Sequence, residues 1–215
     1  AASDVYKRQP WSNLRVENDS TLVGYKLVKG RGPERHVYFT AVFSKPFRDF
    51  GIMQDTIPVK YNTNRFRSSL EAWGKDLRFW MRFPTRQGEV VTVKTAVSAV
   101  SSDGAKLNMQ ELEGKTFASL KAEGEKLWEG QLSKFKIEAT PEQRDTFYTS
   151  VYHAFLHPFI FQDADGKFRE LDKNIGQAEG FTNYTVFSLW DTYRALHPLF
   201  NLVQRDINAD IVNSM

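Results

Sequence analysis

The spacing of hydrophobic residues changes character once along this 215-residue chain, near Asn108. Before that point apolar and polar side chains alternate, which is the period of a β-strand with one buried face. After it apolar residues recur every three or four positions, which is the period of an amphipathic helix. Strands followed by helices predict a protein with a β part first and an α part second.

The β part is expected to be an antiparallel β-sandwich that is incomplete on its N-terminal side. Alternation is clearest in two runs, with Val37, Phe39, Ala41 and Phe43 on one face, and Val91, Val93, Val97 and Ala99 on another. Turn-forming pairs punctuate the region, including Lys45-Pro46, Gln87-Gly88 and Asp103-Gly104. A strand pair that closes the core is predicted from Trp73, Phe79, Trp80 and Phe83.

The α part begins with a predicted linker helix over residues 115–132. Thr140-Pro-Glu-Gln143 predicts the start of the next helix, since Thr suits the N-cap, Pro the first turn and Gln the capping-box position. Pro158 is expected to close that helix. Phe155-Leu-His-Pro158 and Ala195-Leu-His-Pro198 repeat one tetrapeptide, which suggests stacked helical hairpins. A polar loop of roughly 25 residues between them is longer than most loops without a function.

Composition excludes several classes of protein. The net charge is only +3, and the basic residues are mixed with acidic ones, so a nucleic-acid-binding surface is not expected. Cysteine is absent, which excludes disulfides, thiolate catalysis and Cys-ligated zinc. No apolar run approaches the roughly 18 residues that a membrane span needs.

Both ends of the sequence suggest a piece of a longer protein. Residues 1–9 resemble translated adapter sequence, and we expect them to be a non-native leader outside the fold. Asp206 is expected to cap a helix whose apolar stripe still continues at Met215. We therefore expect an internal fragment.

The segment Phe187–Phe200 concentrates residues suited to binding a sugar. Ser188 and Asp191 have the spacing of a capping box, which would place Trp190 and Asp191 in the first turn of a helix. Trp190 and Arg194 are four residues apart and would share one helix face. An indole can stack on a sugar ring while a carboxylate and a guanidinium bind its hydroxyls. The alternative is an N-cap followed by aromatic residues that fill a core.

Two other patterns could suggest metal sites. Asp163-Ala-Asp165-Gly166 is similar to the opening of a calcium loop, but the remaining ligand positions are out of register, so a turn is the better interpretation. His153 and His157 lie four apart on one helix face, as zinc ligands can. Without a third ligand, helix packing and capping of the helix C-terminus explain them better. No metal ligand is assigned.

The chain resembles the family 92 glycoside hydrolases, calcium-dependent exo-acting α-mannosidases. The resemblance rests on the following segments in the second half: Phe147-Tyr-Thr-Ser-Val-Tyr-His153, Pro158, Asp163-Ala-Asp-Gly166 and Thr185-Val-Phe-Ser-Leu-Trp-Asp-Thr-Tyr-Arg-Ala-Leu-His-Pro198. In the first half it rests on Val37-Tyr-Phe39, Phe43-Ser-Lys-Pro-Phe47 and Val97-Ser-Ala-Val-Ser101, followed by Ala105, Asn108 and Glu111. The Ser-x-Trp-Asp-x-x-Arg segment is the most specific part.

The resemblance implies an antiparallel β-sandwich followed by the first helices of a truncated (α/α)6 toroid. The expected parts are a leader over 1–9, a partial sandwich over 10–112, a helical linker over 113–140 and an incomplete catalytic domain over 141–215. Trp190 would stack on a terminal mannose, Asp191 would bind its hydroxyls, and Arg194 would contact the sugar or hold Asp191.

The function implied is an inverting exo-α-mannosidase that acts on mannose-containing glycans in the periplasm or at the bacterial cell surface. The catalytic acid and base, and most ligands of the Ca²⁺ ion, would lie beyond Met215, so the fragment itself is expected to be inactive. Two alternatives remain at this stage: another (α/α)6 glycosidase, such as a phosphorylase or glucoamylase relative, and a non-catalytic carbohydrate-binding β-sandwich module.

Overall fold

A computed structural model describes residues 8–29, 34–54, 57–58 and 70–215, with side chains described from Trp11 onward except at positions 54, 57–58 and 70. The chain divides into two compact units, which we describe separately. The sheet unit contains Ala1–Glu111 and Asp163–Gly176, and the helical unit contains Leu112–Gln162 and Gln177–Met215. Most of the predicted leader lies outside the described residues, although the first strand already begins at Arg8.

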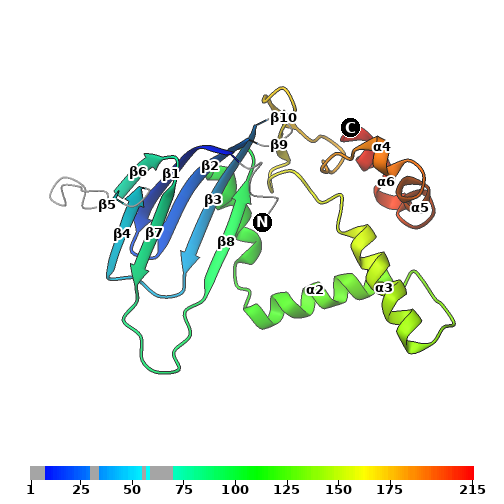
Figure 1. Ribbon diagram of the computed structural model, residues 1–215, viewed down its shortest axis with the longest axis horizontal. Coiled ribbons are helices and arrows are strands. Elements are labelled where there is room, and N and C mark those ends of the chain that lie inside the picture. Colours follow the sequence, from blue (N-terminus) through cyan, green and yellow to red (C-terminus); the bar gives the residue numbers. More distant parts are fainter. Residues whose placement is uncertain (1–7, 30–33, 55–56, 59–69) are drawn as a thin grey trace. The chain divides into compact units, whose positions relative to one another are not determined.

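Among the described residues, the sheet unit contains two main antiparallel sheets and a separate two-stranded sheet of β9 and β10 (Figure 1). The larger has the order β6-β1-β2-β3-β8 and the smaller the order β5-β4-β7. The strands are β1 (Arg8–Asn18), β2 (Thr21–Lys29), β3 (Arg35–Phe43), β4 (Asp49–Gln54), β5 (Ile57–Pro58), β6 (Leu70–Gly74), β7 (Leu77–Arg82) and β8 (Val93–Ser98). An antiparallel β region ahead of the helices is therefore confirmed.

The core of this unit lies between the two sheets. Its buried members are Leu14, Val16, Leu22, Ala41, Phe47, Ile52 and Ala72. Phe47 is the centre of an aromatic cluster, with ring centroids 5.4 Å from Phe50 and 6.1 Å from both Phe43 and Phe79. Edge-on ring pairs of this kind stabilise a core beyond the area that they bury.

Two of the predicted core contributions are wrong. Trp73 is 51% exposed and Trp80 is 43% exposed, because alternation places them on the outer faces of the two sheets. Val93 and Val97 of β8 are also exposed, while Ala96 and Ser98 on the opposite face are buried. The buried face of β8 is the one that carries the helix α1.

Helix α1 (Ser102–Met109) covers the outer face of the larger sheet at β3 and β8. Ser101 caps it by accepting a hydrogen bond from the Gly104 N–H at 2.9 Å, and Ala105 of this helix is completely buried. Residues 163–176 also belong to the sheet unit. They contain β9 (Lys167–Arg169) and most of β10 (Ile175–Gln177), which pair as a hairpin. The loop predicted between the two main helices thus contributes to the sheet unit.

The helical unit follows a one-turn 3-10 helix (Gln110–Leu112) and contains α2 (Phe117–Leu132), α3 (Pro141–Phe155), α4 (Leu189–Thr192), α5 (Leu196–Val203) and α6 (Arg205–Asn213). The capping box of Thr140 and Gln143 is confirmed at the start of α3. Phe155 packs on Phe200 with ring centroids 5.8 Å apart, and Phe200 is 2% exposed. The helix predicted from Asp206 begins at Arg205, with Gln204 rather than Asp206 as its N-cap.

No helix in the described part of the chain is both long and apolar enough to cross a membrane.

Candidate functional site

The Phe187–Phe200 segment forms two short helices separated by a turn, and not the single helix that the sequence predicted. Helix α4 ends at Thr192, and α5 begins only at Leu196. Ser188 is the N-cap of α4, but its side chain makes no capping hydrogen bond, so the predicted capping box is wrong. Instead, the Ser188 carbonyl accepts the N–H groups of Asp191 at 3.0 Å and Thr192 at 3.3 Å. The Thr192 hydroxyl donates to the same carbonyl at 3.2 Å, so the Ser188 carbonyl and not its side chain closes this turn.

The aromatic residues of the segment divide into buried and exposed sets. Phe200 is buried, and the Phe187 ring stands edge-on to His157 and His197, at centroid distances of 4.8 Å and 5.1 Å. Trp190, in contrast, is 84% exposed, and Tyr193 is 57% exposed. Trp190 therefore lies outside the core of the described residues, whereas Phe187 and Phe200 pack on one another with ring centroids 6.1 Å apart, as the alternative expects of core aromatics.

The exposed rings and charges lie close together in sequence and in space. The rings of Trp190 and Tyr193 have centroids 6.4 Å apart and are inclined by 32°. Asp191 and Arg194 are both exposed, and the ion pairs found in the described part of the chain include neither of them. Among the described residues the two side chains thus form no ion pair with one another, and their roles in sugar binding stay a prediction.

A short two-stranded contact anchors the beginning of this segment. Thr185 N–H donates to the Phe159 carbonyl at 2.9 Å, and Phe161 N–H donates to the Asn183 carbonyl at 2.8 Å. Asn183 is 3% exposed, and its side-chain amide returns a hydrogen bond to the Phe161 carbonyl at 2.8 Å. These bonds fix residues 183–186 against residues 159–161, so the exposed α4 turn leaves from a rigid base.

His157 supports the same base. Its Nε2 lies 3.3 Å from the Val186 carbonyl oxygen, and its Nδ1 lies 3.4 Å from Thr185 Oγ1. The expected packing role is therefore present, but the C-terminal cap of α3 is formed by the backbone, through the Leu156 N–H and the His153 carbonyl. A zinc site is not supported by these contacts.

Family profiles cover almost the whole chain. The profile of the "Glycosyl hydrolase family 92 N-terminal domain" matches residues 2–98. The profile of the "Glycosyl hydrolase family 92 catalytic domain" matches residues 104–215. The chain belongs to glycosyl hydrolase family 92. The two alternatives, a relative of another (α/α)6 family and a non-catalytic sandwich module, are not supported.

Solved structures of family 92 enzymes resemble the chain over nearly its full length. The α-mannosidase BT3965 from Bacteroides thetaiotaomicron is 66% identical over 97% of this chain, with a TM-score of 0.92, and it was also solved with mannoimidazole. The inverting mannosidase BT2199 from Bacteroides thetaiotaomicron VPI-5482 shares the fold at 23% identity and a TM-score of 0.82, over 96% of this chain. In both cases the chain spans 28% of the relative's length. No curated protein matches the chain.

The family 92 domain boundary does not coincide with the boundary of packing. Most of α1 and the whole of residues 163–176 fall within the catalytic-domain match, yet both belong to the sheet unit. The chain therefore returns to the sheet unit, where Asp163 bonds to Ser98 and Asn108, and Arg169 donates to the carbonyls of Ala99 and Val100. The sequence gives little sign of this return, since 163–176 looks like a polar loop.

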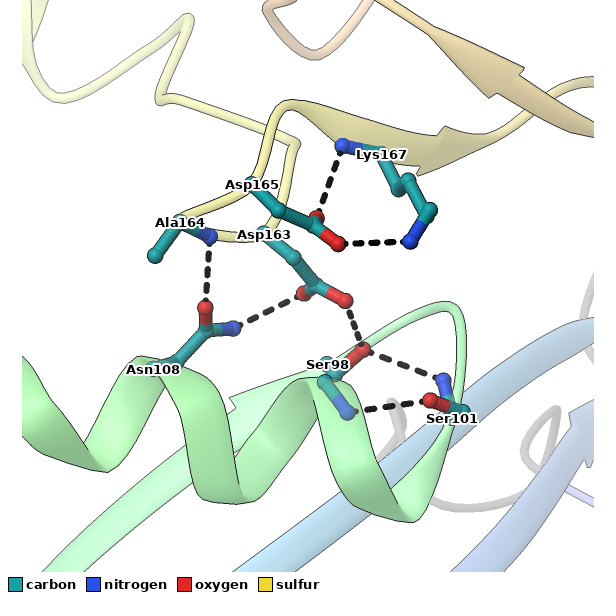
Figure 2. A network of polar contacts seen from close by, with 8 residues as sticks. Ser98, Ser101, Asn108, Asp163, Ala164, Asp165 and Lys167 are labelled. Carbon is teal, nitrogen blue, oxygen red and sulfur yellow. Dashed lines mark hydrogen bonds and ion pairs between the residues drawn. The ribbon is translucent and has the colours of Figure 1, made fainter.

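The return is fixed by Asp163, which is 4% exposed (Figure 2). Its Oδ2 accepts the Ser98 hydroxyl at 2.7 Å, and its Oδ1 accepts the Asn108 amide at 2.8 Å. Gly166 N–H donates to the Asp163 carbonyl at 2.8 Å, and Gly166 has a φ of 82°, which suits glycine. The predicted turn is confirmed.

These residues do not fit the calcium ion associated with the family. Both oxygens of Asp163 are already occupied by donors, and Asp165 pairs with the Lys167 ammonium at 2.7 Å. That hydrogen bond holds the pKa of the Asp165 carboxyl below its ordinary value. Among the residues that the structure describes, no group of three or more His, Cys, Asp or Glu is placed to hold a metal ion.

Proposed function

We propose that this chain is part of an inverting exo-α-mannosidase that releases terminal mannose from glycans. One observation supports this most strongly: 66% identity to a family 92 α-mannosidase over 97% of the chain. At that identity we expect the two proteins to share their activity as well as their fold. Since the chain spans only 28% of that relative, the activity is proposed for the complete protein.

The exposed α4 turn is the proposed sugar-binding element. Trp190 offers the broad indole face on which the C–H face of a mannose ring can stack. Asp191 can accept hydrogen bonds from sugar hydroxyls, and Arg194 can donate them. The structure of the α-mannosidase BT3965 in complex with mannoimidazole supports the proposal that related chains bind a mannose-like ring. This chain would contribute one wall of such a pocket.

The helices of the helical unit are proposed to be the first helices of an (α/α)6 toroid. Their exposed apolar residues support this, because Phe117 of α2 is 81% exposed and Leu202 of α5 is 69% exposed. Large apolar side chains left in water are expected to be covered by further structure.

The chemistry requires an acid, a base and a metal site, which we propose to lie outside this chain. An inverting glycosidase needs one carboxylic acid to protonate the leaving oxygen and one carboxylate to activate water. We place both, and the calcium ligands, in the remainder of the protein, and we place the enzyme in the periplasm or at the bacterial surface. The residues of this chain would bind and orient the terminal sugar.

Hydrolysis of an aryl α-mannoside by the complete protein tests the proposal. We expect release of mannose first seen as the β-anomer by proton NMR, and no hydrolysis above background by the 215-residue chain alone. First appearance of the α-anomer would contradict inversion. Failure of the complete protein to cleave any α-mannoside, or turnover by the chain alone, would contradict the corresponding part of the proposal.

A further inference from the structure

The outer face of the larger sheet carries a row of aromatic residues. The strand register aligns Trp73 of β6 with Asn13 of β1, Asn13 with Tyr25 of β2, and Tyr25 with Tyr38 of β3. Trp11 precedes Asn13 by two residues, so its side chain leaves the same face. Residues on this face point away from the core between the sheets, to which Leu14 and Ala72 belong.

Two of these rings are open to solvent. Trp11 is 42% exposed and Trp73 is 51% exposed, whereas Tyr25 and Tyr38 are partly buried, with ring centroids 4.8 Å apart. Helix α1 covers the sheet mainly at β3 and β8, so the tryptophans stand on the uncovered strands β1 and β6. Register makes Trp11 and Trp73 diagonal neighbours, whose separation on a sheet is about 7–8 Å.

Polar groups lie beside the two rings, with Asn13 directly opposite Trp73 and Glu71 next to Trp73 on β6. Asn13 is 8% exposed, and its amide donates to Glu71 Oε1 at 2.9 Å and to the Ala72 carbonyl at 3.3 Å. The Glu71 carboxylate is exposed and has further lone pairs for donors from a ligand. An amide and a carboxylate beside flat rings suit a ligand that presents hydroxyl groups and C–H faces together.

The charges along this face are balanced. Glu17, which lies on the same face as Asn13, pairs with both Arg15 and Lys106. An unbalanced basic stripe, which a nucleic acid would need, is not formed by these groups. The surface therefore suits a neutral, polyhydroxylated ligand.

We propose that Trp11 and Trp73, with Asn13 and Glu71, form a glycan-binding surface on the sheet unit, whose ligand is an extended mannose-containing polysaccharide. The two indoles would stack on sugars of one chain, and Glu71 would accept hydrogen bonds from their hydroxyls. The surface itself is argued from its own geometry, while the choice of mannose rests on the proposed function.

Trp80 provides a matched control on the smaller sheet. It is exposed to a similar extent, at 43%, but its ring lies directly over Gly51, where an added Cβ would come within 2.6 Å of the indole nitrogen. The Arg82 guanidinium lies over the same ring, 5.5 Å from its centroid. Trp80 therefore already has partners from the protein where a sugar would have to stack.

Affinity electrophoresis of the 215-residue chain in gels that contain soluble α-mannan tests the proposal, with dextran gels for comparison. We expect retardation by mannan only. Trp11→Ala and Trp73→Ala should each weaken it about tenfold, and the double variant should lose it. Trp73→Phe should keep most of it, and Trp80→Ala should leave it unchanged. Near-UV circular dichroism checks that each variant is folded.

Unchanged retardation of the folded double variant would overturn the proposal, as would no retardation of the parent chain. Equal retardation in dextran would overturn the assignment to mannose. If Trp73→Ala instead converts a dimer into a monomer in sedimentation without affecting mannan binding, the face is a contact between copies. Because hydrolysis by the complete protein is assayed separately, loss of the proposed activity leaves this binding result interpretable.

Discussion

Asn108 and Asp163 hold one another by a reciprocal hydrogen-bonded arrangement, although 55 residues separate them. The Asn108 amide donates to Asp163 Oδ1 at 2.8 Å, and its own carbonyl oxygen accepts the Ala164 N–H at 2.7 Å. With Ser98 on the second carboxylate oxygen, every part of the buried carboxylate is satisfied (Figure 2). Helix α1 and the turn at 163–166 are thereby joined.

Asp163→Ala should destabilise the sheet unit by about 2–3 kcal/mol, because it leaves the donors of Ser98 and Asn108 buried without an acceptor. Urea unfolding measures this free energy. Asp165→Ala is the matched control, since Asp165 is largely exposed in its pair with Lys167 and should cost less than about 0.5 kcal/mol. Equal losses of unfolding free energy for both substitutions would show that the hydrogen bonds of Asp163 do not stabilise the sheet unit.

Gly104→Ala should be disruptive although Gly104 lies in a helix. A Cβ there would collide with Asp163 Oδ2 and lie 2.7 Å from Ser98 Oγ. We expect a loss of about 1–3 kcal/mol. In contrast, Gly124→Ala in α2 meets no atom within 4 Å and should stabilise that helix by about 0.5–1 kcal/mol. Thermal unfolding followed by circular dichroism distinguishes the two signs.

The two predicted helix starts should respond differently to removal of the hydroxyl. Thr140 accepts from the Gln143 N–H and completes a capping box, so Thr140→Ala should cost about 1 kcal/mol. Ser188 makes no side-chain cap, so Ser188→Ala should be close to neutral. Chemical denaturation of both variants is sufficient, and a larger loss for Ser188→Ala would refute the assigned geometry.

His36 should make the sheet unit less stable in mild acid. Burial, followed by the charges of Arg169 and Lys173, lowers the pKa of His36 below the ordinary 6.5, while Glu34 opposes this. The unfolded chain therefore binds the proton first as pH falls through about 6.5, and stability is lost below that pH. His36→Gln should remove this part of the pH dependence. Proton NMR titration of the ring, with a pKa above 6.5, would contradict it.

Periodicity predicted the elements well where one face of an element is buried. The alternation around Phe39 and Ala41 became β3, and Thr140-Pro-Glu-Gln143 became the start of α3. These signals are local, because a strand period and a capping box depend on neighbouring residues only.

The errors arose where tertiary contacts decide. Trp73 and Trp80 alternate correctly with the core positions but face outward, and no local pattern tells which face of a strand meets the second sheet. Val97 is exposed because α1 covers the opposite face of β8, which buries Ser98 instead. The sequence placed Ser98 in a strand and Asn108 in a family motif, but it did not predict that they bond to the same residue. Their common partner, Asp163, lies far along the chain.

In the candidate site, too, the sequence predicted the residue types but not the local fold. Trp190, Asp191 and Arg194 could be selected from the sequence, and the exposure of all three agrees with a binding role that remains a proposal. The prediction of a single helix there was wrong, because residues 193–195 form a turn that no pattern in the sequence indicates.

The value of kcat/KM for an aryl α-mannoside, measured for the complete protein and its Asp191→Ala variant, tests the central claim most directly. If Asp191 binds the terminal mannose, the folded variant should lose roughly a hundredfold or more, which is about 2.7 kcal/mol of transition-state stabilisation. Trp80→Ala, on the outer face of the smaller sheet, should keep near-normal kinetics. Near-normal kinetics in folded Asp191→Ala would contradict the claim that this segment binds the sugar.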